Sequence, residues 1–167
     1  LEIALETVYR AIEFGGEHRI PVILNPAPAT KDLDFNYVCK CDFFIPNESE
    51  LEILTGMPVS SIEQIKAAAS SLVDKGVKNV IVTMGSRGVM WVSDRDAQIV
   101  ESFTVDAVDT TGAGDAFIGC FAHHYIQNGD IVHSIKMANA FAALSVTKRG
   151  TQDSYPSVDD MNRFIDN

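Results

Sequence analysis

Cysteine is scarce in this sequence: there are three among 167 residues, and they cannot all pair with one another. Cys39 and Cys41 form a Cys-x-Cys pair without a second pair or nearby histidines, so neither a disulfide framework nor a zinc site is expected. The third, Cys120, stands alone. We therefore expect reduced structural thiols and a cytoplasmic protein, because the cytosol keeps thiols reduced.

Basic side chains and long apolar runs are also few. Lysine and arginine number 13 against 23 acidic residues, which gives a net charge of −10. Such a surface repels the nucleic-acid backbone, so nucleic acid is excluded as a partner, whereas a single nucleotide is not. We expect no membrane partner, because the sequence shows neither a spanning stretch nor a signal peptide. The chain starts at Leu1 rather than at a methionine, and we expect it to be part of a longer one.

Strand and helix patterns alternate along the chain. Short apolar runs that end at Leu24, Ile45 and Val82 predict buried strands, and apolar residues at helical spacing predict helices around them. The predicted helices cover residues 4–18, 48–54, 61–75, about 115–127, 131–147 and 159–165, and a hairpin joins 89–92 to 98–103. This order predicts one α/β domain over residues 1–167, with a mostly parallel sheet flanked by helices. Ligands of such sheets bind beyond the carboxyl ends of the strands.

Residues 109–115 read DTTGAGD and stand directly before an apolar helical pattern. Glycines let the backbone approach a ligand, and the unpaired N–H groups of a helix start attract an anion such as phosphate. The segment is not the phosphate loop that ends in Gly-Lys-Ser/Thr, because no lysine follows the second glycine. Asp115 would repel phosphate, so it needs another reason to be there. It either caps the helix or takes a proton from a nucleophile that attacks the phosphate.

Two further segments lie at predicted strand ends. Residues 83–88 contain two glycines, a serine and Arg87, and form either a turn that enters the hairpin or a loop that wraps phosphates. Residues 47–50 are a standard helix start with Asn47 as the N-cap. Alternatively, Glu50 reaches a metal-bound water in a phosphate site.

Other polar residues allow two interpretations each. Residues 148–156 (KRGTQDSYP) place basic residues at a predicted helix end, which is ordinary capping, but their carbonyls and hydroxyls also suit a monovalent or hard cation. Asn139 stands among apolar residues of a predicted helix and is either a surface residue or a contact to a nucleobase. The four histidines show no triad or metal spacing, and we expect His123 and His124 at the surface.

Taken together and in this order, these segments resemble the carbohydrate kinases of the ribokinase family. The likeness rests on DTTGAGDAF at 109–117, NESE at 47–50, VTMGSRG at 82–88, NPAPA at 25–29 and KRGTQDSYP at 148–156. It implies a three-layer ribokinase-like α/β fold and an ATP-dependent kinase that phosphorylates the primary hydroxyl of a pentose. The implied sugar is D-ribose first, which would become ribose 5-phosphate, with 2-deoxyribose and other sugars as alternatives.

The resemblance also implies roles by position. Asp115 would be the catalytic base, and the N–H groups of Gly112, Ala113 and Gly114 would form the anion hole for the transferring phosphoryl group. The residues that would contact or lie near ATP are Asn47, Thr83, Gly85, Ser86, Arg87, Gly88, Gly114 and Asn139. The implied cations are Mg²⁺, which Glu50 would help to order, and an activating K⁺. The residues that would surround K⁺, several of them through backbone carbonyls, are Asp109, Thr111, Ser145, Lys148, Gly150 and Ser154.

Members of the family that this chain resembles are about twice its length. Their N-terminal half carries most of the sugar-binding residues and a small β-lid, through which the family often forms homodimers. The resemblance therefore implies that this chain holds the ATP side and the base, and that the N-terminal half and the β-lid are absent. A non-catalytic module that binds a nucleotide and a partner is the alternative from another functional class.

Overall fold

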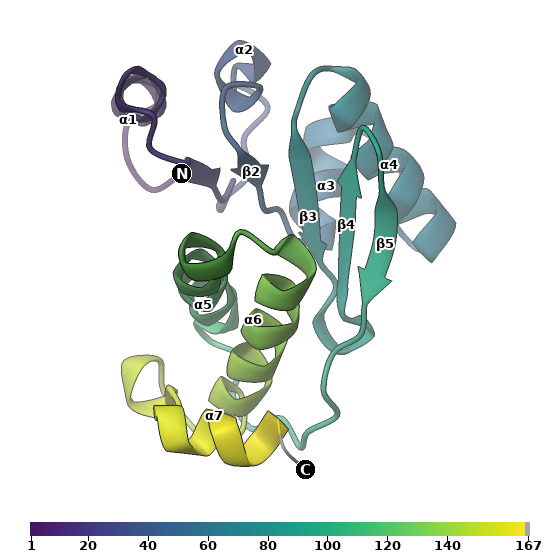
Figure 1. Cartoon of the computed structure of the whole chain (residues 1–167). Helices are drawn as coiled ribbons and strands as arrows, with labels where there is room; N and C mark the ends of the chain where they lie inside the picture. The colour runs from purple at the N-terminus through teal and green to yellow at the C-terminus, as the bar shows by residue number, and fades with distance from the viewer. Residues whose placement is uncertain (166–167) are drawn as a thin grey trace. The chain divides into compact units, whose positions relative to one another are not determined.

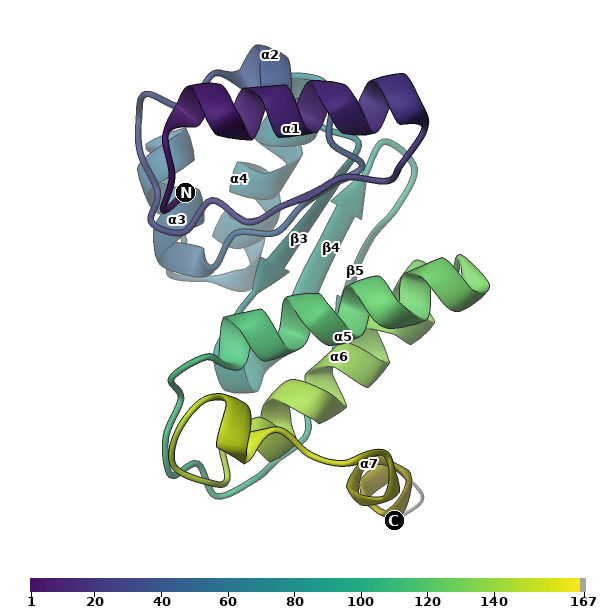
Figure 2. The same ribbon diagram turned by 90° about the vertical axis from the view of Figure 1, so that its left-hand side faces the viewer.

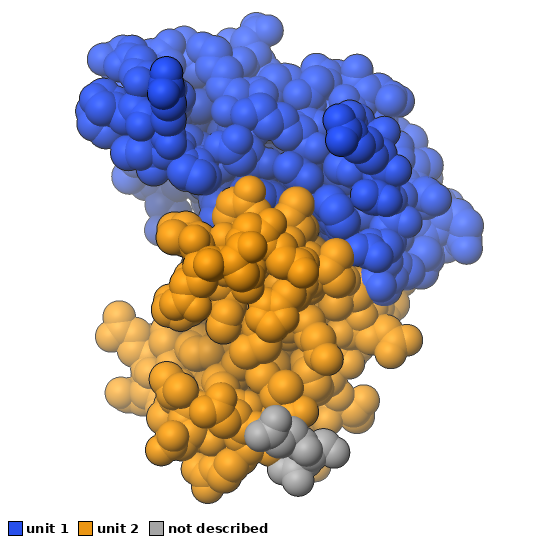
Figure 3. Space-filling model, in the orientation of Figure 1, with its two compact units in different colours: residues 1–84, 90–99 blue, residues 85–89, 100–167 orange. Residues whose placement is uncertain are grey.

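The computed structural model describes residues 1–165, and the chain forms two compact units (Figure 3). Unit 1 comprises residues 1–84 and 90–99, and unit 2 comprises residues 85–89 and the segment from residue 100 onward. The sequence predicts a single domain over residues 1–167, and that stays a prediction. Within the described part of the chain, no helix combines the length and apolar character needed to cross a membrane.

A five-stranded sheet organises unit 1, with the strands in the order β1–β2–β3–β4–β5. They are β1 (Ile23–Leu24), β2 (Phe43–Phe44), β3 (Asn79–Thr83), β4 (Val89–Ser93) and β5 (Ala97–Val100). The first three are parallel, with Leu24 opposite Phe44 and Phe44 opposite Val80, so their carboxyl ends share one edge. Figure 1 shows β4 running against β3 and β5, which makes the sheet mixed.

Helices fill the connections of this sheet: α1 (Leu5–His18), α2 (Phe35–Val38), α3 (Glu48–Thr55) and α4 (Ile62–Asp74). Figure 1 shows α3 and α4 behind β3, β4 and β5. On α4, Ile65, Ala69 and Leu72 share one face and are buried in the core, as their helical spacing predicts. The sequence pattern does not predict α2, since four residues are too few for helical periodicity.

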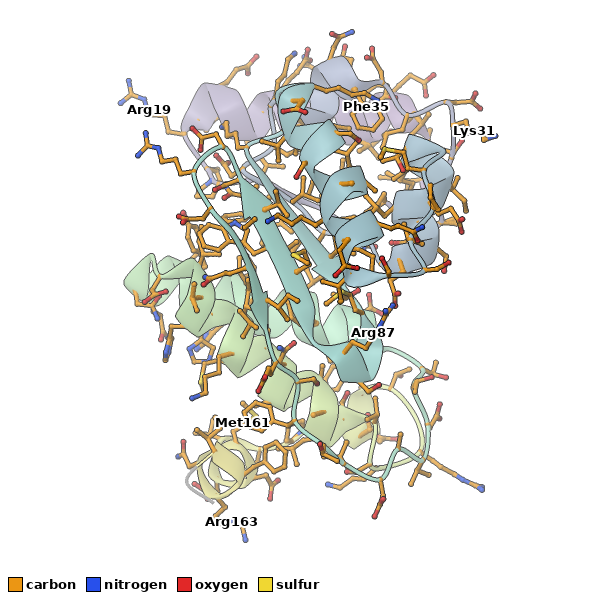
Figure 4. The ribbon with its side chains drawn as sticks, turned by 90° about the vertical axis from the view of Figure 1, so that its right-hand side faces the viewer. Arg19, Lys31, Phe35, Arg87, Met161 and Arg163 are labelled. Atoms are coloured by element: carbon orange, nitrogen blue, oxygen red, sulfur yellow. The ribbon has the colours of Figure 1, made fainter. Side chains whose placement is uncertain are left out.

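Unit 2 is built on two long helices, α5 (Ala113–Asn128) and α6 (Ile131–Ser145). They pack side by side (Figures 1 and 2), and Phe121 of α5 and Ile135 of α6 are fully buried. A short 3-10 turn, η2 (Gln152–Ser154), leads to α7 (Val158–Ile165), whose Met161 is also buried. A second such turn, η1 (Gly85–Arg87), ends in the arginine that is labelled in Figure 4.

The predicted helices agree with these bounds to within a few residues, but the second strand of the hairpin is shorter than predicted. The sequence predicts it over residues 98–103, whereas β5 ends at Val100. The carbonyls of Val100 and Glu101 accept hydrogen bonds from the Asn139 side chain of α6, at 3.2 and 3.0 Å. The strand ends where the Asn139 side chain, rather than a neighbouring strand, donates to these carbonyls.

Candidate functional site

The N-terminus of α5 leaves backbone donors unpaired. Gly112 is its N-cap, with a left-handed backbone (φ 77°), and no side chain caps the helix. The Ala113 N–H donates to the Thr110 carbonyl at 3.2 Å. Among the described residues, nothing accepts a hydrogen bond from the N–H groups of Gly112, Gly114 and Asp115. Together with the positive end of the helix dipole, these donors form a site that suits an anion.

Asp115 is the third residue of α5, and it is exposed. The interpretation of Asp115 as the helix cap is wrong, because Gly112 occupies the cap position and no side-chain cap bond is present. A carboxylate without a capping bond is available to accept a proton beside the unpaired N–H groups. Its role as the base stays a prediction. Sequence reasoning missed the N–H of Asp115 itself, which helix geometry places among the free donors.

Asp109 fastens the turn before α5 to the loop after α6. Its Oδ1 accepts from the Thr111 N–H at 3.0 Å, and its Oδ2 accepts from the Gly150 N–H at 3.1 Å. The Val146 carbonyl accepts from the N–H groups of Val108 and Asp109 at 2.7 and 3.1 Å. The hydrogen bonds from Gly150 and Thr111 hold the pKa of Asp109 below its usual value, which favours the charged carboxylate. Three of the residues predicted to surround K⁺ are thereby brought together.

The loop after α6 also approaches the cap of α5. A Cβ at Gly112 would lie 3.2 Å from the Thr151 Cγ2, closer than carbon atoms normally approach. Position 112 therefore needs glycine for its positive φ and for the space. Sequence reasoning missed Thr151 as a neighbour of the cap. Thr151 follows Gly150 directly, within the segment 148–156 that resembles the family, and this position could have indicated that it lies near the cap.

The other residues predicted around K⁺ have local partners. Ser145 (2% exposed) and Ser154 (1% exposed) are buried, and their hydroxyls donate to carbonyls three residues earlier, at 2.8 and 2.6 Å. Lys148 lines a cavity of about 320 Å³ together with side chains of α7. The part of the chain that the structure describes holds no group of three or more His, Cys, Asp or Glu suited to a metal ion. A cation here would rest on one carboxylate with carbonyl and hydroxyl oxygens.

Asn139 is buried in α6 (5% exposed), so its interpretation as a surface residue is wrong. Its Nδ2 donates to the carbonyls of Val100 and Glu101, which uses both amide protons inside unit 2. Its Oδ1 takes no part in these two bonds, and the contact with adenine stays a prediction. Gly88 lies against the same segment: its φ is +87°, and a Cβ there would clash with the Val100 carbonyl. Residues 100–101 are thus bonded to the Asn139 side chain and packed closely against the Gly88 backbone.

In unit 1, Asn47 and Glu50 form a capping box at the start of α3. The Asn47 Oδ1 accepts from the Glu50 N–H at 2.9 Å, and the Glu50 Oε2 accepts from the Asn47 N–H at 2.8 Å. The predicted helix start is confirmed. Glu50 is 9% exposed and has its other carboxylate oxygen outside the capping box, so its role toward a metal-bound water stays a prediction. Thr83 pairs with Asn47 in an isolated parallel bridge.

Two adjacent histidines of α5, His123 and His124, come together with His133 of α6 in unit 2. The ring centroids of His123 and His124 are 5.1 Å apart, and those of His124 and His133 are 5.8 Å apart. Burial lowers the pKa of His124, and the nearby His123 and His133 lower it further. His123 is exposed as predicted, whereas His124 is half-buried.

The predicted site residues fall into two sets, one in each unit. Unit 1 holds Asn47, Glu50 and Thr83 at the shared carboxyl edge of β2 and β3. Unit 2 holds the others, and among these Gly85–Arg87 form the exposed turn η1. Within each set, the contacts described above join residues that the sequence keeps apart.

Residues 1–158 match the family described as pfkB family carbohydrate kinase. A deoxyribokinase from Salmonella typhi is 61% identical over 166 residues, which are 99% of this chain and 54% of that protein. The structure of Arabidopsis thaliana ribokinase complexed with ribose and ATP has a TM-score of 0.91 at 29% identity, covering 98% of this chain and 53% of that one. A putative ribokinase II from E. coli, in complex with ATP and Mg²⁺, has a TM-score of 0.81 at 28% identity, covering 97% of this chain and 54% of that one.

The chain spans about half the length of the curated relatives it matches. The ribokinase-like α/β fold predicted from the sequence is confirmed by its similarity to these structures. The family match extends through both units, from residue 1, ahead of α1, to the start of α7. The chain belongs to the pfkB family of carbohydrate kinases.

Proposed function

We propose that this chain is the nucleotide-binding, phosphoryl-transferring part of an ATP-dependent sugar kinase that acts on the primary hydroxyl of a pentose. The observation that carries the proposal is the start of α5. There, the unpaired N–H groups of Gly112, Gly114 and Asp115 lie beside the exposed Asp115 side chain. Phosphoryl transfer needs both functions, because the transferring group is anionic and the attacking hydroxyl must lose a proton.

In the proposed reaction, Asp115 accepts the proton of the sugar hydroxyl while the hydroxyl oxygen attacks the γ-phosphorus of ATP. The bond between that phosphorus and the β,γ-bridging oxygen breaks, and ADP leaves. The unpaired N–H groups of α5 stabilise the charge on the transferring phosphoryl oxygens. Asp109 holds the turn in shape by accepting from Thr111 and Gly150 on its two sides.

The family resemblance assigns nucleotide contacts to Asn47, Thr83 and residues 85–88, and these are part of the proposal. The E. coli relative is in complex with ATP and Mg²⁺, and a buried carboxylate with one oxygen outside the capping box, as in Glu50, suits such a hard cation or its water. Asp109 with the neighbouring carbonyl oxygens is the set that would hold K⁺, which would supply positive charge beside the turn.

The proposed sugar is 2-deoxyribose ahead of D-ribose. The 61% identity to a protein named deoxyribokinase favours this order, since the ribokinase complexed with ribose is 29% identical. The two sugars differ only in the 2-hydroxyl. A site built to hydrogen-bond that hydroxyl rejects the sugar that lacks it, whereas a site without such a partner discriminates weakly. D-Ribose is therefore the direct comparison in any assay.

The test joins the chain to the part of the Salmonella deoxyribokinase that it does not cover, and compares this chimera with the chain alone. We expect both proteins to bind ATP in calorimetry, and the chimera to release ADP faster with 2-deoxyribose than with D-ribose. Asp115→Asn should lower turnover of the chimera by about 10²–10⁴-fold, because it removes the proton acceptor, while ATP affinity is kept. Asp159→Asn is the matched control, since Asp159 is an exposed acid in the first turn of α7.

Turnover retained by Asp115→Asn would contradict the assignment of the base. An equal loss in Asp159→Asn would point to a general effect of charge. A chimera that binds ATP but phosphorylates neither sugar would favour a second candidate, a nucleotide-binding module without catalysis. That candidate is kept because the chain spans about half the length of its relatives.

A further inference from the structure

The end of β1 lacks one donor in its hydrogen-bond ladder with β2. Along this parallel pair, the Phe43 N–H donates to the Val22 carbonyl at 3.1 Å and the Ile45 N–H donates to the Leu24 carbonyl at 2.9 Å. In a parallel ladder, the next donor on the β1 side is the N–H of residue 26, and its acceptor is the Ile45 carbonyl. Residue 26 is a proline, which has no N–H.

Asn25 supplies the missing donor with its side chain. Its Nδ2 donates to the Ile45 carbonyl at 2.8 Å, and its Oδ1 accepts from the Ala27 N–H at 3.2 Å. Ile45 is 1% exposed, and a buried carbonyl without a donor is costly. The Asn25 side chain therefore replaces a ladder bond that the backbone cannot make.

This bond completes the support of the corner that leads into α3. The carbonyl just before Asn47 accepts from the Thr83 N–H at 3.0 Å, and the Asn47 N–H donates to the Glu50 Oε2 at 2.8 Å. With Asn25 bound to Ile45, the corner is held by β1 on one side and by β3 on the other. The backbone that carries the capping box thus has a fixed place at the carboxyl edge of the sheet.

We propose that Asn25 is a positioning residue, which orients Asn47 and Glu50 toward ATP and its Mg²⁺ by holding the Ile45 carbonyl. The inference rests on the proposed function, since that function assigns Asn47 and Glu50 to the nucleotide and its metal. Asn25 acts through the backbone. Without its donor, the corner keeps the bond from the Ile45 N–H to the Leu24 carbonyl and the one on Thr83, but the Ile45 carbonyl loses its link to β1.

The test measures the ATP affinity of the chain by calorimetry, with and without Mg²⁺, and takes the ratio of the two dissociation constants. Asn25→Asp keeps an oxygen for the Ala27 N–H but turns an oxygen toward the Ile45 carbonyl, so it removes the donor and adds a negative charge. We expect MgATP affinity to fall by about tenfold, and the affinity for ATP without Mg²⁺ to change less. A purely structural role would not change this ratio.

Asn79→Asp is a matched control. The Asn79 Nδ2 donates to the Asp42 carbonyl at 2.9 Å, and its Oδ1 accepts from the Trp91 Nε1–H at 3.0 Å. It makes the same two kinds of bond as Asn25, but at the amino end of β3, away from the shared carboxyl edge. We expect Asn79→Asp to lower stability without changing the Mg²⁺ ratio.

A second pair of variants keeps the test decisive if Asn25→Asp fails to fold. Asn25→Ala removes the donor, and adding Pro26→Ala restores a backbone N–H where the ladder needs one, so MgATP affinity should recover. An unchanged ratio in Asn25→Asp, an equal change in Asn79→Asp, or no recovery with Pro26→Ala would overturn the positioning role. A chain that binds no ATP in either condition would overturn the proposed function, and this inference with it.

Discussion

Gly112→Ala places a methyl group at the N-cap of α5, where the backbone is left-handed and the new Cβ would lie 3.2 Å from the Thr151 Cγ2. A left-handed backbone costs an L-residue about 1–2 kcal/mol. Relieving the contact requires the loop or the cap to move, and overpacking of this kind costs about 1–3 kcal/mol. We therefore expect Gly112→Ala to lower the free energy of unfolding by about 2–5 kcal/mol.

Gly129 offers a matched control at the other end of the same helix. It is the C-cap of α5, its φ is 70°, and a Cβ there would meet nothing within 4 Å. Gly129→Ala therefore carries only the backbone cost, about 1–2 kcal/mol. The difference between the two variants measures the contact with Thr151 and what that contact does to the cap.

Urea denaturation gives the two free energies of unfolding, and calorimetry gives the ATP affinity of each variant. We expect weaker ATP binding only in Gly112→Ala, because a displaced cap misdirects the N–H groups of Gly114 and Asp115. Adding Thr151→Ser removes Cγ2 and should return the stability to that of Gly129→Ala. Equal losses of stability and of ATP affinity in both glycine variants would refute the reasoning.

Three further predictions concern unit 2. The pKa of His124 is lowered in the fold, so the unfolded chain takes up the proton first as the pH falls. The free energy of unfolding should therefore decline below pH 6.5. Denaturation at several pH values should show a flatter pH dependence for His124→Gln than for the unchanged chain. Asn139→Leu leaves the carbonyls of Val100 and Glu101 without their donor and should lower the free energy of unfolding in urea by about 1–3 kcal/mol; an unchanged value would contradict that support. The chimera should turn over faster in KCl than in NaCl at equal ionic strength. Asp109→Asn should remove this difference, because the carboxylate charge is lost. Equal rates of the unchanged chimera in both salts would count against a K⁺ site.

Local signals in the sequence are sufficient for helices whose ends depend on neighbouring residues. Asn47 and Gly56 mark the ends of α3 in the sequence, and the structure has them as its N-cap and its left-handed C-cap. Ser61 caps α4 in the same way. Each of these signals acts within one turn, so the residues next to the helix end are enough to indicate it.

The residues of the site could be named from the sequence, but their partners could not. Asn139 shows why. A polar residue among apolar residues of a helix can lie at the surface, or it can be buried and make hydrogen bonds there. Its acceptors lie 38 and 39 residues away, on a segment that no periodicity connects to α6. The same holds for Asp115, whose capping role was excluded only when the cap of α5 was seen to be Gly112.

The sequence by itself determined the α/β class, the helices other than α2 and the ordered segments that identify the family, because periodicity, capping and glycine turns depend on residues a few positions apart. The tertiary structure alone decided which donors stay free at α5, that Asp109 reaches Gly150 across 41 residues, and that Asn25 stands in for the N–H that Pro26 lacks. These outcomes depend on which loops and strand ends the fold brings within hydrogen-bond distance, and that distance is set by the packing of the whole chain.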